Sequence, residues 1–125
     1  YRIFFKKIRK KILQIYQNIK NISKDNKIYG FGASTKGNVS LQVCKLDGTL
    51  IKGIYDVNKE KFNCYTPGSK ILIRDEKYLI KDRPDYIIFQ IWHFKKTIKE
   101  KFKKYNLKNT KFVWLFPKFK ITKKV

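Results

Sequence analysis

The residues whose types and spacing suggest chemistry lie in one glycine-rich segment, YGFGASTKGNVSL, at positions 29–41. It contains three of the six glycines in the chain, Gly30, Gly32 and Gly37. Glycine lets a backbone turn sharply and lets a phosphate approach it closely. A loop that ends at a helix N-terminus also offers N–H groups and a favourable dipole to an anion. The segment therefore predicts a phosphate-binding loop.

Polar side chains within the loop suit the same chemistry. Ser34, Thr35 and Asn38 can donate hydrogen bonds or cap a helix. Lys36 adds a positive charge, which can contact a phosphate or simply remain solvated. The glycines have a structural alternative as well, since they would also allow a strand and a helix to pack closely.

The glycine spacing is Gly-x-Gly-x4-Gly, whereas dinucleotide-binding loops have Gly-x-Gly-x2-Gly, and Thr35 stands at the third position of that pattern. An acid nevertheless follows where such proteins bind a ribose hydroxyl. Asp56 ends a predicted strand, 19 residues after Gly37. The loop, the strand context and Asp56 together favour a nucleotide-like ligand.

Two further candidates lie outside the loop. Trp92 and His93 follow a strongly apolar strand, at the sheet edge where ligands of open α/β folds bind. Trp92 can stack on a base or sugar or belong to the core, and His93 can exchange a proton near neutral pH. Pro67 and Gly68 form a turn, with the Gly68 amide near the ligand as an alternative. No catalytic set of residues stands out.

The two cysteines, Cys44 and Cys64, form no CxxC pair, and His93 is the only histidine. A zinc site would need a fourth ligand from Asp or Glu. We expect two buried or half-buried free thiols and no metal site.

The formal charge of +22, from 31 Lys and Arg against 9 Asp and Glu, attracts polyanions such as nucleic acids and anionic lipids. The basic residues are nearly all lysines spread over every segment, and Ile, Asn, Tyr and Phe are also abundant. An A/T-rich coding sequence would produce the same bias. Binding to nucleic acid or to a membrane surface is therefore an alternative that depends on charge alone.

The hydrophobic periodicity predicts alternating helices and strands. The predicted helices cover 2–22, 37–45 and 94–106, with one or two helical turns at 75–81. The predicted strands cover 28–32, 50–56, 70–74, 84–92 and 111–116. This order predicts a small three-layer, Rossmann-like α/β domain with a mostly parallel sheet of four to five strands. The basic, amphipathic helix 2–22 is expected to pack on the core, with a membrane surface as the alternative.

The length of 125 residues predicts a single domain, 1–125. No run approaches the roughly 18 apolar residues of a membrane span, and no signal peptide is recognisable. We therefore expect a cytoplasmic location. The chain contains no methionine, even at position 1, which suggests a piece of a longer protein or a processed chain.

Several blocks together carry a resemblance to a known family. They are GFGASTKGN, YDVNKEKFNCYTPGSKILI, RPDYIIFQIWHF and KFVWLFPKFKI. In order and spacing they resemble the C-terminal domain of sugar C-methyltransferases, which use S-adenosylmethionine to methylate a carbon of a nucleotide-linked deoxysugar. The resemblance extends from about residue 8 to residue 121, nearly the whole chain.

The resemblance implies a longer enzyme. In this family a zinc-bearing domain and a central methyltransferase domain precede a Rossmann-like C-terminal domain, which helps to hold the sugar nucleotide. The zinc cysteines, the methyl-donor motif and the His/Tyr base belong to those upstream parts. S-adenosylmethionine is thus implied for the full enzyme and not for this chain, which alone should not transfer methyl groups. The upstream domain would be a partner in cis or in trans, unless the chain is a stand-alone binding module.

The resemblance implies that the glycine loop and Asp56 lie at the nucleotide-sugar cleft. Pro67, Gly68 and Trp92 fall in the shared blocks, so the resemblance implies cleft or scaffold positions for them. The family usually has Asn in place of His93. The candidate substrate-binding residues are Gly30, Gly32, Ala33, Ser34, Thr35, Lys36, Gly37, Asn38, Asp56, Pro67, Gly68, Trp92 and His93. The competing functions are a dinucleotide-binding domain of an oxidoreductase and a basic protein that binds nucleic acid or a membrane surface.

Overall fold

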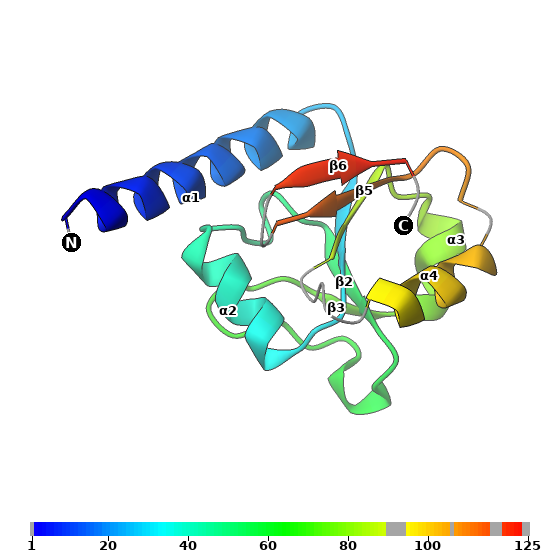
Figure 1. The fold of residues 1–125 in the computed structure, drawn as a ribbon. Helices are drawn as coiled ribbons and strands as arrows, with labels where there is room; N and C mark the ends of the chain where they lie inside the picture. The colour runs from blue at the N-terminus through cyan, green and yellow to red at the C-terminus, as the bar shows by residue number, and fades with distance from the viewer. Residues whose placement is uncertain (1, 90–94, 106, 116–118, 124–125) are drawn as a thin grey trace.

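The computed structural model describes residues 2–89, 95–105, 107–115 and 119–123 (Figure 1). The helices are α1 (Arg2–Ser23), α2 (Thr35–Val43), α3 (Leu79–Asp82) and α4 (Lys95–Lys103). The strands are β1 (Ile28–Phe31), β2 (Gly53–Asp56), β3 (Ile73–Asp75), β4 (Tyr86–Phe89), β5 (Lys111–Trp114) and β6 (Lys120–Thr122). Two short 3-10 helices, η1 (Lys59–Lys61) and η2 (Glu76–Tyr78), follow β2 and β3.

The strands form one sheet in the order β3-β2-β1-β4-β5-β6. The first five strands are parallel, and β6 pairs antiparallel with β5. The first strand, β1, lies at the centre of the sheet. The chain then adds β2 and β3 on one side of it and β4 and β5 on the other. This is the doubly wound strand order of Rossmann-like folds, so the predicted α/β class is confirmed.

Helices cover both faces of the sheet and make three layers, as predicted (Figure 1). The residues of β4 alternate between two apolar clusters, because successive side chains of a strand point to opposite faces. Ile88 belongs to the cluster that includes Ile19 of α1 and Leu41 of α2. Ile87 belongs to the cluster that includes Leu79 of α3 and Phe102 of α4. The strand is therefore buried on both faces, as its continuous apolar run predicted.

A polar network lies beside the second cluster. The Asp82 carboxylate accepts hydrogen bonds from both the Nε and an Nη group of Arg74, at 3.0 and 3.1 Å. It also accepts one from the Tyr55 hydroxyl at 2.8 Å, and the ring of Tyr55 stacks on Tyr29 at a centroid distance of 5.0 Å. Burial, together with the hydrogen bond to Asp82, raises the pKa of Tyr55. The network ties β2 and β3 to α3.

The sheet has six strands rather than the predicted four to five, because β6 was not anticipated. Lys120 and Ile121 are exposed and Thr122 is half-buried. Such a short edge strand carries no apolar alternation, which is the signal on which strand prediction depends.

The predicted strand 50–56 begins only at Gly53. The backbone N–H groups of Leu50 and Ile51 instead donate to the carbonyl of Asp47, which extends the preceding turn. The apolar residues at 50 and 51 gave the appearance of a longer strand.

Two other predicted elements are shifted along the chain. Strand 70–74 was expected, but β3 occupies 73–75 because the N–H of Lys70 closes a turn onto the carbonyl of Thr66. Helix 37–45 was expected, but α2 begins two residues earlier because Ser34 caps it. Three predicted elements are shorter in the described residues. Helix 94–106 corresponds to α4, strand 84–92 to β4 and strand 111–116 to β5. Residues 90–94, 106 and 116 lie outside the described residues.

Within the described ranges, no helix is long and apolar enough to cross a membrane. The amphipathic α1 packs on the sheet as expected, but only through its C-terminal half, where Ile15 and Ile19 are buried. Its N-terminal half extends away from the body of the domain (Figure 1).

Both cysteines are free thiols, as expected, but they differ in exposure. Cys44 is buried at the end of α2, and burial raises the pKa of its thiol to about 11. Cys64 is exposed, which corrects the expectation that both would be buried or half-buried. It lies in the long connection between β2 and β3, where an apolar residue type alone does not determine burial.

We expect a thiol reagent such as dithionitrobenzoate to label one cysteine quickly in the folded chain at pH 8. The exposed Cys64 reacts, whereas Cys44 is inaccessible and holds its proton, and the thiolate is the reactive form. Cys64→Ser should abolish the fast phase, and Cys44→Ala should leave it unchanged. Two equally fast cysteines in the wild-type chain would contradict the packing of α2.

Candidate functional site

The candidate site lies at the carboxyl edge of the sheet, where β1, β2 and β4 end. β1 is the strand from which the chain winds in both directions, so the edge between β1 and β4 is the switch point of the topology. Ligands of open α/β sheets bind at this position. The glycine loop leaves β1 at this edge and leads directly into α2.

Gly32 makes the turn that carries the chain from β1 to α2. Its φ of +90° is a conformation that other residues rarely adopt. Its N–H donates to the carbonyl of Tyr55 on β2, at 2.8 Å. A Cβ at this glycine would meet no atom within 4 Å, so there is open space beside the turn. The predicted sharp glycine turn is therefore present, and Gly30 is buried within β1 before it.

The Asp56 carboxylate fastens this loop to the end of β2. One oxygen accepts the N–H of Ala33 at 2.8 Å, and the other accepts the N–H of Asn58 at 2.8 Å. Asp56 thus lies beside the glycine loop, as its spacing from the loop predicted. Both of its oxygens bond to backbone, and each retains a lone pair with which to accept a hydroxyl.

Lys61 is a residue of this site that sequence reasoning missed. Its ammonium donates to the carbonyl of Ala33 at 2.9 Å, so both polar groups of the Ala33 backbone are bonded, one to Asp56 and one to Lys61. The side chain reaches the loop from η1 and places a positive charge beside it. The connection that follows β2 contains both Lys59 and Lys61 among other polar residues, and nothing in its sequence distinguishes one lysine from the other.

The N-terminus of α2 begins at Thr35 and faces the same edge. Ser34 is its N-cap, with the Oγ accepting the N–H of Gly37 at 3.0 Å and the carbonyl accepting the N–H of Asn38 at 2.9 Å. Within the part of the chain that the structure describes, Lys36 makes no ion pair, and its side chain is exposed. An anion at this helix end would therefore meet a free cation and the positive end of the helix dipole.

Asn38, Pro67 and Gly68 form a separate group on the flank of α2. The Pro67 carbonyl accepts hydrogen bonds from the side-chain amides of Asn38 and Gln42, and Asn38 Oδ1 accepts the Ser69 hydroxyl at 2.6 Å. The side chain of Asn38 is thus largely occupied by the turn. These residues support the helix rather than line the loop, so the simple turn interpretation of Pro67 and Gly68 accounts for their contacts.

Trp92 and His93, the remaining candidates, lie outside the described residues. Among the residues that are described, no group of three or more His, Cys, Asp or Glu side chains has the arrangement of a metal site.

An ion pair between the buried Glu76 and the half-buried Lys101 lies on the α4 side of the sheet and was not predicted. Glu76, directly after β3, places Oε1 2.8 Å from the ammonium of Lys101 on α4. That ammonium also lies 5.3 Å from the centre of the Phe31 ring, at the end of β1. Burial, followed by the charge of Glu76 and a hydrogen bond with it, raises the pKa of Tyr105. The pair fixes α4 beside the ends of β1 and β3.

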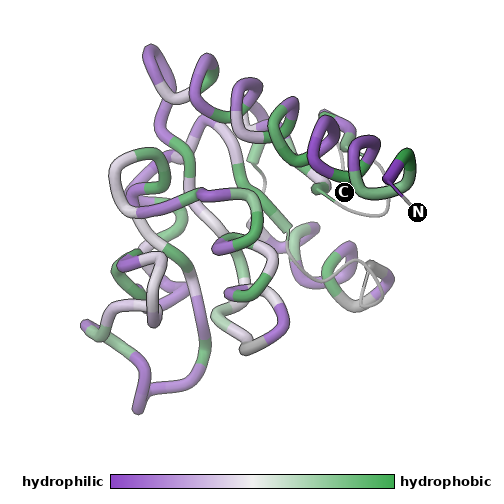
Figure 2. Tube along the Cα trace, turned by 90° about the vertical axis from the view of Figure 1, so that its left-hand side faces the viewer, coloured by the Kyte–Doolittle hydropathy of each residue, from purple (hydrophilic) through white to green (hydrophobic). Residues whose placement is uncertain are grey.

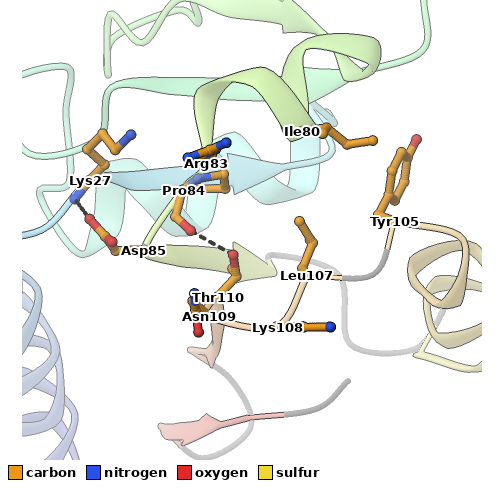
Figure 3. A pocket seen from close by; sticks show the side chains of 10 residues that line it. All are labelled: Lys27, Ile80, Arg83, Pro84, Asp85, Tyr105, Leu107, Lys108, Asn109 and Thr110. Carbon is orange, nitrogen blue, oxygen red and sulfur yellow. Dashed lines mark hydrogen bonds between the residues drawn. The ribbon is translucent and has the colours of Figure 1, made fainter.

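A pocket of about 470 Å³ lies at the opposite, amino edge of the sheet (Figure 3). Two hydrogen bonds hold the segments that form it. Asp85 accepts the N–H of Lys27 at 2.7 Å, and Pro84 accepts the hydroxyl of Thr110 at 2.7 Å. These bonds join the segments before β1, β4 and β5, and none of the predicted site residues lines this pocket. The pocket is therefore separate from the glycine-loop site.

Comparison with known families identifies the class of protein to which this fold and loop belong. The model of the C-methyltransferase C-terminal domain family matches residues 1–117, and the chain therefore belongs to this family. The resemblance stated from the sequence is thus confirmed.

No curated protein matches the sequence. Among solved structures, UDP-D-quinovosamine 4-dehydrogenase from Vibrio fischeri is similar at 20% identity and a TM-score of 0.46. The match covers 71% of this chain and 76% of that one. A likeness this distant says nothing about the ligand of the present chain.

We expect Gly68→Ala to lower the free energy of unfolding by about 1–3 kcal/mol. Its φ is +75°, and a Cβ would lie 2.5 Å from Nε2 of Gln42. In a Gln42→Ala background the clash disappears and only the backbone strain remains, so the same substitution should cost less. Urea denaturation of the four proteins measures the difference. Equal costs in both backgrounds would contradict the contact between this turn and α2.

Proposed function

We propose that the chain is the nucleotide-sugar-binding, C-terminal domain of an S-adenosylmethionine-dependent C-methyltransferase that acts on a nucleotide-linked deoxysugar. Membership of the C-methyltransferase C-terminal domain family supports the class of enzyme. The observation that supports the ligand is the glycine turn at Gly32, which leads the chain into the N-terminus of α2. Lys61 donates to the Ala33 carbonyl beside this turn, and Lys36 is an exposed residue of the first turn of the helix. The domain would act in the cytoplasm as part of a longer enzyme.

The diphosphate of the ligand would bind at the N-terminus of α2. The positive end of the helix and the Lys36 ammonium attract the negative charge. Lys61 contributes to the positive potential while it holds the Ala33 carbonyl. A ribose or sugar hydroxyl would then donate to a remaining lone pair of Asp56. These contacts bind and orient the sugar and perform no covalent step.

The same residues do not fit the methyl donor. S-adenosylmethionine carries a positive sulfonium and no phosphate, whereas Lys36 and Lys61 place positive charge beside the glycine loop. The donor and the catalytic base are therefore assigned to the methyltransferase domain that would precede this one. We expect the chain alone to bind nucleotide sugar without transferring a methyl group.

The experiment is a calorimetric titration with a deoxythymidine-diphosphate deoxysugar, a nicotinamide dinucleotide, S-adenosylmethionine and a short oligonucleotide, at low and moderate salt. The nucleotide sugar should bind at both salt concentrations. Binding of the dinucleotide alone would favour an oxidoreductase domain. Binding of the oligonucleotide alone, lost as salt rises, would assign the function to the general positive charge.

We expect Lys36→Ala to weaken nucleotide-sugar binding about tenfold, because one charge-assisted hydrogen bond contributes about 1.5 kcal/mol. Lys99→Ala, which removes the same charge from an exposed position on α4, is the matched control and should change the affinity less than twofold. Equal affinities of the two variants would contradict the role of Lys36 in phosphate binding.

A further inference from the structure

The apolar stripe of α1 continues beyond the part of the helix that packs on the sheet. Ile15 and Ile19 are 5% and 0% exposed, whereas Phe4 and Phe5 are 64% and 50% exposed. Figure 2 shows apolar positions recurring along the helix toward its free end. A monomeric domain seldom leaves neighbouring aromatic side chains in water. The N-terminal half of α1, Arg2–Gln14, therefore presents an uncovered apolar face.

A groove between α1 and α2 lies further along the helix, where Ile12 and Leu13 contribute to its lining. The groove has a volume of about 590 Å³. Its apolar lining comes from Ile12, Leu13 and Tyr16 of α1 and from Val43 of α2, and basic side chains, including Lys45, also line it. Such a concave, apolar strip between two helices has the form in which an amphipathic helix binds.

The charge of the surface restricts its occupant. Arg2–Gln14 contains six basic residues and no acidic one. A second copy of the same face would meet like charge, which opposes self-association. A complementary partner has an apolar stripe flanked by Asp and Glu side chains.

The shape of the surface favours a protein over a lipid bilayer. An interfacial helix buries its apolar face in a flat layer. Here Val43 of α2 and Leu13 of α1 line one groove, so a flat surface would leave part of the apolar lining uncovered. A helix from a partner protein can enter the groove and contact both walls.

Family membership indicates the source of this partner. The family match begins at residue 1, so α1 belongs to the domain that the family shares. The family is that of a C-terminal domain of C-methyltransferases, whose other domain must lie against this one if it is to act on a sugar bound here. This step rests on the proposed function, because it requires a sugar bound to this domain.

We propose that the groove between the N-terminal half of α1 and the C-terminal end of α2 is the docking surface for an acidic amphipathic helix of the methyltransferase domain. Docking buries Ile12, Leu13 and Val43 and pairs the flanking basic side chains with carboxylates. The contact holds the sugar-binding domain against the domain that carries the methyl donor.

Photo-crosslinking tests this assignment. Benzoylphenylalanine replaces Leu13 in the groove, and the protein is irradiated in an extract of the cells that carry the gene. Mass spectrometry should find an adduct with a polypeptide that contains a methyl-donor-binding domain. If that domain lies in the same polypeptide in the cell, the same substitution is made in the full-length protein. That protein is irradiated and digested, and the adduct is mapped within it. The same group at Tyr65, an exposed residue outside the groove, should give no such adduct.

A matched pair of variants shows whether the groove itself makes the contact. Val43→Asp places a carboxylate in the groove and should reduce the adduct at least fivefold. Val57→Asp adds the same charge at another exposed valine and should leave it unchanged. Circular dichroism confirms that both variants fold. Equal adduct yields from the two variants would overturn the proposal.

The other possible occupants give different results. Adducts between two copies of the chain, with a dimer in sedimentation, would assign the face to self-association. Flotation with phosphatidylglycerol vesicles at moderate salt, without a methyltransferase adduct, would assign it to lipid. Adducts with many unrelated proteins, or none, would also overturn the proposal. Nucleotide-sugar binding should be the same in Val43→Asp and wild type, so the two proposals fail separately.

Discussion

The carboxyl edge of the domain depends on the Asp56 carboxylate, which accepts one backbone N–H from each of two loops. It holds Ala33 after β1 and Asn58 after β2, and so joins the glycine loop to the connection that carries Lys61. A carboxylate that accepts two N–H groups is a strong acceptor, and loss of either bond would leave a polar group unpaired. The position of the N-terminus of α2 follows from this attachment, since Ser34 caps that helix one residue after Ala33.

Most of this edge could be predicted from local sequence. Gly32 is a residue type that accepts the positive φ of a sharp turn. Ser34 was one of three loop residues expected to donate hydrogen bonds or to cap a helix, although the helix was expected to begin later. The position of Asp56 beside the loop could be predicted because the length of a strand–helix–strand unit fixes how far apart in sequence two neighbouring strand ends lie. The doubly wound order followed from the alternation of helices and strands. In each case the information lies within one element or one repeat of the fold.

The features that escaped prediction depend on contacts between distant segments. Lys61 reaches Ala33 across 28 residues, and Glu76 pairs with Lys101 on a helix that follows the next strand. A single sequence rich in lysine does not show which lysine finds a partner. β6 was missed because its residues are mostly exposed and its place in the sheet comes from pairing with β5. The hydrogen bonds from Asn38 and Gln42 to the carbonyl of Pro67 were also not predicted, since they join a turn to a helix 25 to 29 residues away.

The domain thus has two surfaces with different physical character. The carboxyl edge is polar and offers donors and cations at the end of a helix, which suits a phosphorylated ligand. The free half of α1 is apolar with basic flanks, which suits a protein helix. Both involve α2, whose N-terminus lies at the first surface and whose C-terminus lies at the second. A single short helix would therefore connect the proposed ligand site with the proposed docking surface.

The most direct test of this account is amide hydrogen exchange across the whole chain, with and without a deoxythymidine-diphosphate deoxysugar. Exchange should slow at residues 30–38 and 56–61, the two loops joined by Asp56, and should not change at the amino-edge pocket around Arg83 and Thr110. Protection at that pocket, or protection nowhere, would contradict a nucleotide-sugar site at the glycine loop.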